Sequence, residues 1–313
     1  MSDKVLVCGS VAFDTITVFE GRFRDHILAD HIKSLSVSFF VPSMRKEYGG
    51  CAGNIAYSLR LLGGKPLPVA TVGSDAADYL EYMKEQGIDI RWVRVLDDMY
   101  TPQCFITTDQ DNNQIASFHP GAMLRSSENA FLRDEGVSWG IVAPDAKDGM
   151  FAHARRMREQ GIPFIFDLGQ AMPLFDGDDL NEMLSMAQIV TANDYEAGII
   201  AERTGRSMED IAQSLQAVVV TRGAQGTTLY EGGQTSDIAP VVAQQVVDPT
   251  GCGDAHRAGL LYGLTHNWSL VDSCRLANVM GSFKISSRGP QNHRPSIAQV
   301  DVALQENYGI RFA

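Results

Sequence analysis

The sequence predicts an α/β protein in which a parallel sheet carries helices on both faces and a small β-sheet forms a lid. Apolar runs alternate with helical patterns after residue 121, as in right-handed βαβ units. Strand patterns alone occupy the segment between residues 90 and 120. Of the 313 residues, 44% are hydrophobic and 20% are charged, which is sufficient for a large core.

The elements before residue 121 follow from local patterns. Residues 4–8 are an apolar run typical of a buried parallel strand, and Asp14 is expected at its carboxyl end. Apolar residues at helical spacing predict a helix that follows Gly53. The next expected elements are a strand over 69–72, a helix over 78–86, and strands over 91–95, 103–107 and 114–118.

After residue 121, strands are expected at 139–143, 163–166, 188–192 and 217–221, and helices at 146–160, 180–187, 195–203, 254–266, 270–286 and 297–307. We assign residues 1–13, 45–89 and 121–313 to an α/β core, and residues 14–44 and 90–120 to the lid. The lid could then cover the carboxyl edge of the sheet, where open α/β sheets bind ligands.

Charge and cysteine content narrow the class of protein. The chain has 38 acidic and 26 basic residues, so its net charge is −12, and such a surface repels nucleic acid. Neither an apolar run of membrane-spanning length nor a signal-peptide pattern is present, so we expect no membrane association and a cytoplasmic location. Five widely spaced cysteines predict neither disulfides nor a zinc site.

A glycine-rich turn precedes one of the predicted helices. Gly251, Cys252 and Gly253 stand at the N-terminus of the helix over 254–266, where free N–H groups and the helix dipole favour a phosphate. Asp254 comes next, and a carboxylate beside a bound phosphate can take a proton from a hydroxyl. The dipole also predicts a lowered thiol pKa for Cys252 if the thiol is exposed; the alternative is that Cys252 is a small buried residue with an inert thiol. The alternative is a plain turn with an acidic first-turn residue.

Residues 49–54 form a second glycine cluster, which opens the helix after Gly53. Its spacing does not match a dinucleotide-binding fingerprint. Close approach of a ligand would explain Gly50, and Asn54 offers a donor and an acceptor to sugar hydroxyls. A helix-capping loop is the alternative.

Two further segments lie at predicted strand ends. Asn193 and Glu196 share one side of a first helical turn, which suits a hydrated Mg²⁺ ion, although an Asn N-cap near an acidic residue gives the same pattern. The other segment is either a plain turn or a loop that lets a nucleotide phosphate approach the backbone, and it contains Thr221, Gly223 and Gly226.

Taken in order, the motifs Gly-Gly-x-x-Gly-Asn, Asn-x-x-Glu, Thr-x-Gly-x-x-Gly and Asp-Pro-Thr-Gly-Cys-Gly-Asp resemble those of the ribokinase-like (phosphofructokinase-B type) carbohydrate kinases. The resemblance covers nearly the whole chain. It implies a ribokinase-like fold with a β-sheet lid and phosphoryl transfer from ATP to a hydroxyl. By position, Asp254 would be the catalytic base, with an anion hole at Gly251, Cys252 and Gly253.

The same resemblance assigns the remaining motif residues. Sugar hydroxyls would be contacted by Asp14, Gly50 and Asn54. The ATP loop would contain Thr221, Gly223 and Gly226, while Asn193 and Glu196 would serve the phosphates and Mg²⁺, the latter through water. A monovalent cation such as K⁺ would bind near Asp248, Thr250 and Gly289.

Within this family the sequence is most similar to bacterial adenosine and nucleoside kinases, which implies a monomer or homodimer that phosphorylates the 5′-hydroxyl of adenosine or a similar nucleoside. Phe105 and Phe118, on expected lid strands, could sandwich a base whose edge pairs with Gln170. Alternatively, both phenylalanines form the lid core. His256, where the family usually has Phe, is expected to pack or to satisfy a polar neighbour, and a role in tuning the site is the alternative.

Two other functions remain open. One is a sugar kinase for ribose or fructose, and the other is a non-catalytic ligand-binding protein with the same fold. The intact Asp254 and its glycines argue against a protein without catalysis.

Overall fold

The structure is a computed structural model, and it describes residues 3–27, 36–111, 113–132 and 136–312. Nine strands form its main sheet. The strands are β1 (Lys4–Cys8), β4 (Lys65–Gly73), β5 (Val93–Leu96), β8 (Val137–Val142), β9 (Phe164–Asp167), β10 (Ile189–Asn193), β11 (Ala217–Thr221), β12 (Thr227–Glu231) and β13 (Gln234–Ile238). Their order is β13-β12-β11-β10-β9-β8-β1-β4-β5. Neighbouring strands are parallel except in the pairs β11–β12 and β12–β13, so β12 alone runs in the opposite direction.

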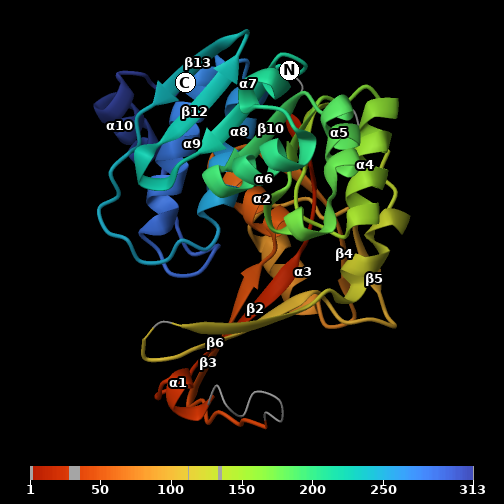
Figure 1. The fold of residues 1–313 in the computed structure, drawn as a ribbon, viewed down its shortest axis with the longest axis vertical. Coiled ribbons are helices and arrows are strands. Elements are labelled where there is room, and N and C mark those ends of the chain that lie inside the picture. The colour runs from red at the N-terminus through yellow and green to blue at the C-terminus, as the bar shows by residue number, and fades with distance from the viewer. Residues whose placement is uncertain (1–2, 28–35, 112, 133–135, 313) are drawn as a thin grey trace.

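Helices cover both faces of this sheet, as predicted (Figure 1). Alternate residues of β1 enter separate cores, because successive side chains of a strand point to opposite faces. Val5 and Val7 pack with α2 (Cys51–Leu61), α3 (Ala77–Glu85), α8 (Cys252–Thr265), α9 (Leu270–Ile285) and α10 (Ile297–Tyr308). Leu6 and Cys8 pack with α4 (Lys147–Glu159), α5 (Gly177–Met186), α6 (Asp194–Thr204) and α7 (Met208–Ala212). None of the helices in the described ranges is long and apolar enough to cross a lipid bilayer.

A separate four-stranded sheet extends from one end of the main body, together with the short helix α1 (Phe23–His26) (Figure 1). It consists of β3 (Ser43–Gly49), β2 (Ala12–Val18), β6 (Gln103–Thr108) and β7 (Gln114–His119), in that order. Strands β2 and β6 are parallel, and the other pairs are antiparallel. We call this sheet the lid.

Several expected boundaries of the lid need correction. The strand expected near 91–95 is β5, which pairs with β4 in the main sheet and not in the lid. All of strand β3 belongs to the lid, although its residues 45–49 were assigned to the core, and Asp14 lies in lid strand β2 instead of ending β1. Short-range patterns show that a segment is extended but not which sheet it joins. Residues 28–35 of the expected lid lie outside the described ranges.

Candidate active site

The N-terminus of α8 presents backbone amides that are not used within the protein. Gly251 has a φ of 81°, a left-handed conformation that favours glycine. Ala255 is the first residue of α8 to donate to a helical carbonyl, that of Gly251, at 2.9 Å. The N–H groups of Gly251, Gly253 and Asp254 meet no acceptor in the part of the chain that the structure describes. They are therefore free to bind an anion.

Cys252 differs from the expected free amide of an anion hole and from the expected activated thiol, and it agrees with the alternative of an inert thiol. Its amide donates to the carbonyl of Pro249 at 3.1 Å, so it is already used by the turn. Burial raises the pKa of the Cys252 thiol to about 11, although the Lys284 ammonium opposes this shift. The expected lowering by the helix dipole is thus overridden by loss of hydration. The thiol is protonated at neutral pH.

A chain of hydrogen bonds holds the carboxylate of Asp254. The Asn54 amide nitrogen donates to its Oδ2 at 2.8 Å, and the Asn54 Oδ1 accepts from Gln291 at 3.0 Å. Gln291 also donates to the Tyr79 hydroxyl, which donates to the carbonyl of Gly49. Asn54 thus orients Asp254, a role that its sequence motif does not reveal. Sequence reasoning missed Gln291 and Tyr79, whose partners are distant in the chain.

A buried ion pair lies one helical turn beyond Asp254. Arg257 donates through Nε and Nη2 to both carboxylate oxygens of Asp167 at 3.0 Å, and through Nη1 to the carbonyl of Gly253 at 3.3 Å. The pair joins the end of β9 to the N-terminus of α8. Sequence reasoning missed this pair, because its two members are 90 positions apart in the chain.

The pKa of Asp254 is raised to about 7, first by burial and then by the charge of Asp167. The hydrogen bond from Asn54 and the charge of Arg257 oppose this shift. A carboxylate with such a pKa is a much stronger base than an ordinary aspartate and still loses its proton near neutral pH. These properties suit a general base.

This pKa predicts the pH dependence of activity. Asp254 is protonated below its raised pKa and cannot accept a proton there, so kcat/KM for the acceptor substrate should fall about tenfold per pH unit below about pH 7. The measurement is kcat/KM across pH 5 to 9 in buffers of constant ionic strength. A plateau that continues down to pH 5 would contradict the role of Asp254.

Asp14 lies where the lid joins the core. Its carboxylate packs over Gly49, where a Cβ would come within 2.6 Å of Oδ2. Gly50 has a φ of 82°, and a Cβ there would come within 2.5 Å of the carbonyl of Ser10. Burial, together with Glu47 and Asp248, raises the pKa of Asp14 to about 6. Gly49 therefore makes room for the Asp14 carboxylate, while Gly50 allows the backbone to pass close to Ser10. Because burial removes water from the Asp14 carboxylate, hydrogen-bond donors of a ligand would stabilise it.

The expected sandwich of one base between Phe105 and Phe118 is wrong. Phe118 pairs with Cys104, which pairs with Asp14, so these three side chains share the face of the lid turned to the site. Phe105 pairs with Ser117 and lies on the opposite face, because neighbouring residues of a strand alternate. Both rings are about half exposed. Only Phe118 remains a candidate for base contact.

Gln170 lies in the short 3₁₀ helix η3 (Gly169–Leu174) that follows β9. Its side chain is exposed and forms no hydrogen bond with any residue in the described ranges. It lies three residues beyond Asp167, at the carboxyl edge of the main sheet. Its pairing with a base stays a prediction.

Asn193 and Glu196 form a capping box at the start of α6. The Asn193 side chain accepts the N–H of Glu196, while the Glu196 carboxylate accepts the N–H and the side-chain amide of Asn193, all at 2.8–2.9 Å. Burial and then the charge of Asp167 raise the pKa of Glu196. Both effects disfavour the charged carboxylate, so a cation bound beside it would stabilise it. One carboxylate suits a hydrated Mg²⁺ ion but does not form a complete protein site.

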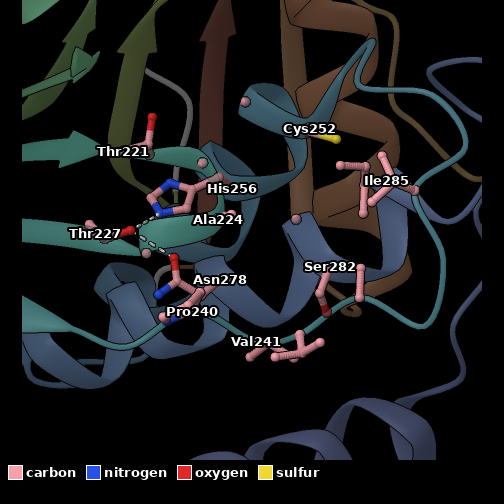
Figure 2. A pocket seen from close by; sticks show the side chains of 17 residues that line it. Thr221, Ala224, Thr227, Pro240, Val241, Cys252, His256, Asn278, Ser282 and Ile285 are labelled. Atoms are coloured by element: carbon pink, nitrogen blue, oxygen red, sulfur yellow. Dashed lines mark hydrogen bonds between the residues drawn. The ribbon is translucent and has the colours of Figure 1, made fainter.

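A cavity of about 370 Å³ begins beside the α8 amides (Figure 2). Thr221, Gly223 and Gly226 line it, as the ATP-loop prediction requires, together with Cys252 and Gly253. Apolar side chains also line it, among them Val241 and Ile285.

His256 also lines this cavity, and burial lowers its pKa to about 3. The Thr227 hydroxyl donates to Asn278 at 2.7 Å and lies 3.2 Å from His256 Nε2 (Figure 2). His256 is therefore a neutral, hydrogen-bonded side chain, as expected, and not an acid or base of the reaction.

The three residues expected near a monovalent cation do come together behind the α8 turn. The Asp248 carboxylate accepts the N–H of Thr250 through Oδ1 and that of Gly289 through Oδ2, both at 2.9 Å. Sequence reasoning missed Glu47, which accepts a hydrogen bond from Asn292 near Gly289 and so connects the lid to this segment.

Comparisons with known proteins agree with this fold and geometry. The family model described as "pfkB family carbohydrate kinase" matches residues 9–297. A nucleoside kinase from Burkholderia thailandensis, solved in complex with inosine, superimposes with a TM-score of 0.89 and 46% identity, covering 98% of this chain and 99% of that one. Its ADP-inosine complex gives a TM-score of 0.86 and 47% identity, covering 98% and 97%. A nucleoside kinase from Methanocaldococcus jannaschii is 28% identical over 275 residues, which are 87% of this chain and 90% of that protein.

The two-sheet fold and the carboxylate beside free helix amides define a phosphotransferase that acts on a hydroxyl group. The chain belongs to the pfkB family of carbohydrate kinases.

Proposed function

We propose that this protein is an ATP-dependent nucleoside kinase that phosphorylates the 5′-hydroxyl of adenosine or another purine nucleoside. The observation that carries the proposal is the Asp254 carboxylate, with its raised pKa, beside the free amides of the α8 N-terminus. The relatives named nucleoside kinases, including one solved with inosine, support the substrate class.

The lid favours a nucleoside over a free sugar. On strands β2, β6 and β7, the face of the lid that carries Asp14 presents an apolar surface, with Ile16 paired to Ile106 and Cys104 paired to Phe118. The neighbouring strand β3 adds Glu47 and Arg45 to the same face. A free sugar carries hydroxyls on all sides and would leave this surface exposed. A nucleobase would cover it, while the ribose reaches Asp14, Gly50 and Asn54.

In the proposed reaction, Asp254 accepts the proton of the 5′-hydroxyl as the oxygen attacks the γ-phosphorus of ATP, and the bond from that phosphorus to the β,γ-bridging oxygen breaks to release ADP. The N–H groups of Gly251 and Gly253 hold the charge of the transferring phosphoryl group. The loop from Thr221 to Gly226 and the cavity behind it would take the adenine nucleotide. Glu196 and Asn193 would hold water ligands of Mg²⁺, which when bound neutralises phosphate charge.

The test is ADP release from ATP and Mg²⁺ with a panel of nucleosides and free sugars. We expect purine ribonucleosides to give kcat/KM at least tenfold above ribose or fructose. Higher efficiency with a free sugar would replace this proposal with a sugar kinase. Absence of turnover with every acceptor would favour a binding protein with the same fold.

Recognition of the ribose gives a separate prediction. If Asp14 accepts hydrogen bonds from the ribose hydroxyls, 2′-deoxyadenosine should show a kcat/KM roughly tenfold or more below that of adenosine, since such a bond is worth about 1.5–3 kcal/mol. The same measurement on Asp14→Asn should show a much smaller ratio between the two substrates. Equal efficiencies in the unaltered enzyme would place the ribose elsewhere.

A further inference from the structure

Lys284 is a buried cation that takes no part in the reaction proposed above. Its side chain is fully buried in the last turn of α9. The ammonium donates to the carbonyl oxygens of Asp248 and Ser287, both at 3.0 Å. These acceptors are backbone carbonyls rather than carboxylates. Burial of an ammonium group is strongly unfavourable unless its hydrogen bonds to water are replaced by bonds within the protein. The two carbonyl oxygens replace some of these bonds, but no carboxylate in the described part of the chain neutralises the charge through a direct hydrogen bond.

The ammonium lies directly behind the turn that carries the anion-binding amides. Asp248, whose carbonyl it binds, also accepts the N–H groups of Thr250 and Gly289 through its carboxylate. The turn continues through Pro249, whose carbonyl accepts the N–H of Cys252. The charge of Lys284 reaches Cys252 within that turn and opposes the rise in its thiol pKa. Lys284 therefore both ties the turn to α9 and places positive charge behind it.

The residues do not fit the monovalent metal ion that the family resemblance implied at Asp248, Thr250 and Gly289. Such an ion needs several free carbonyl or carboxylate oxygens. Here the carbonyl of Asp248 accepts from Lys284, and both of its carboxylate oxygens accept backbone N–H groups. A metal ion on the same carbonyl would also lie close to the ammonium, and two like charges repel strongly where water is excluded.

We propose that Lys284 is the resident cation of this site and that the enzyme works without K⁺. The proposal rests on the proposed kinase function. An ammonium group is a compact point charge that binds carbonyl oxygens, as a monovalent metal ion would. Lys284 is a positioning residue: it holds the 248–251 turn and supplies fixed positive charge behind the amides that bind the phosphoryl group.

The first test uses the unaltered enzyme. Activity should be the same within twofold in KCl and in tetramethylammonium chloride at equal ionic strength, with ATP supplied free of alkali metal ions. Saturable stimulation of several-fold by K⁺ would overturn the proposal. This test requires no substitution, so a variant that fails to fold does not weaken it.

The second test removes the ammonium. Lys284→Met keeps most of the length of the side chain but not its charge, and we expect kcat/KM to fall tenfold or more. Added K⁺ or NH₄⁺ should restore part of the loss, whereas tetramethylammonium, which is too large, should not. If Lys284 only caps the end of α9, no cation will be selective in this rescue, and the proposal fails.

Thermal unfolding provides a readout that does not depend on the substrate. K⁺ should raise the Tm of Lys284→Met more than tetramethylammonium does, and it should leave the Tm of the unaltered protein unchanged relative to tetramethylammonium. Lys65→Met, at an exposed lysine that pairs with Asp3 on the surface, is the matched control and should show no selective effect. If no acceptor is phosphorylated but this difference appears, the proposed function fails while the cation role stands.

Discussion

Asp254→Asn is expected to lower kcat by about 10²–10⁴, the usual range for loss of a general base. The substitution keeps the size of the side chain and an oxygen that can accept the hydrogen bond from Asn54. It removes only the ability to take the proton of the attacking hydroxyl. The measurement is steady-state ADP release at saturating ATP and nucleoside.

Binding and folding serve as controls for this prediction. Because the free N–H groups at the α8 N-terminus are backbone groups, calorimetry should show ADP affinity within a few-fold of the unaltered value. The Tm should not fall, since the neutral side chain avoids the burial of a charge. The variant should also lose the decline of activity below about pH 7. Turnover near that of the unaltered enzyme would remove Asp254 from the mechanism.

Arg257→Met is expected to lower the free energy of unfolding by about 3–5 kcal/mol, because it leaves the buried carboxylate of Asp167 without its partner. Activity should fall as well, since Arg257 also binds the carbonyl of Gly253 next to the base. In the folded fraction, loss of the positive charge should raise the pKa of Asp254 further, so the acid limb of kcat/KM should move above about pH 7. Denaturant unfolding and a pH profile measure these effects.

Substitution of Asp167, the ion-pair partner of Arg257, separates the effect of lost packing from the effect of lost charge. Asp167→Asn removes a negative charge that raises the pKa of Asp254, so it should move the acid limb toward lower pH, the opposite direction. The double variant Arg257→Met/Asp167→Leu should recover much of the stability lost in Arg257→Met, since no unpaired charge remains buried. If both single variants move the acid limb in the same direction, the charges do not act on Asp254.

Local patterns predicted most of the helices and strands well. Helices α8 and α9 lie within two residues of their expected ends, because apolar spacing and terminal glycines are properties of neighbouring residues. The hairpin of β12 and β13 and the lid strand β3 were not predicted. Strand β3 contains Arg45, Lys46 and Glu47, and so lacks the apolar pattern of a buried strand.

The residues of the candidate site that belong to sequence motifs were predicted, and those outside the motifs were not. Asp254 with its glycines and the Thr221 loop lie where backbone geometry requires small or capping residues, so the sequence marks them as candidates. The Asp248 segment followed only from the family resemblance. The second role of Asn54 was not visible, since its partners Asp254 and Gln291 are 200 and 237 positions away.

The sequence by itself determined the α/β class, the order of most elements and the turn that leads into Asp254, because periodicity, capping and glycine conformations act between near neighbours. Only the tertiary structure decided which sheet β5 joins, which face of the lid carries Phe118, and which cations lie near Asp254 and its turn. Arg257 meets Asp167 across 90 positions, and Lys284 meets Asp248 across 36. Such contacts depend on how the strands and helices are packed, which no local pattern records.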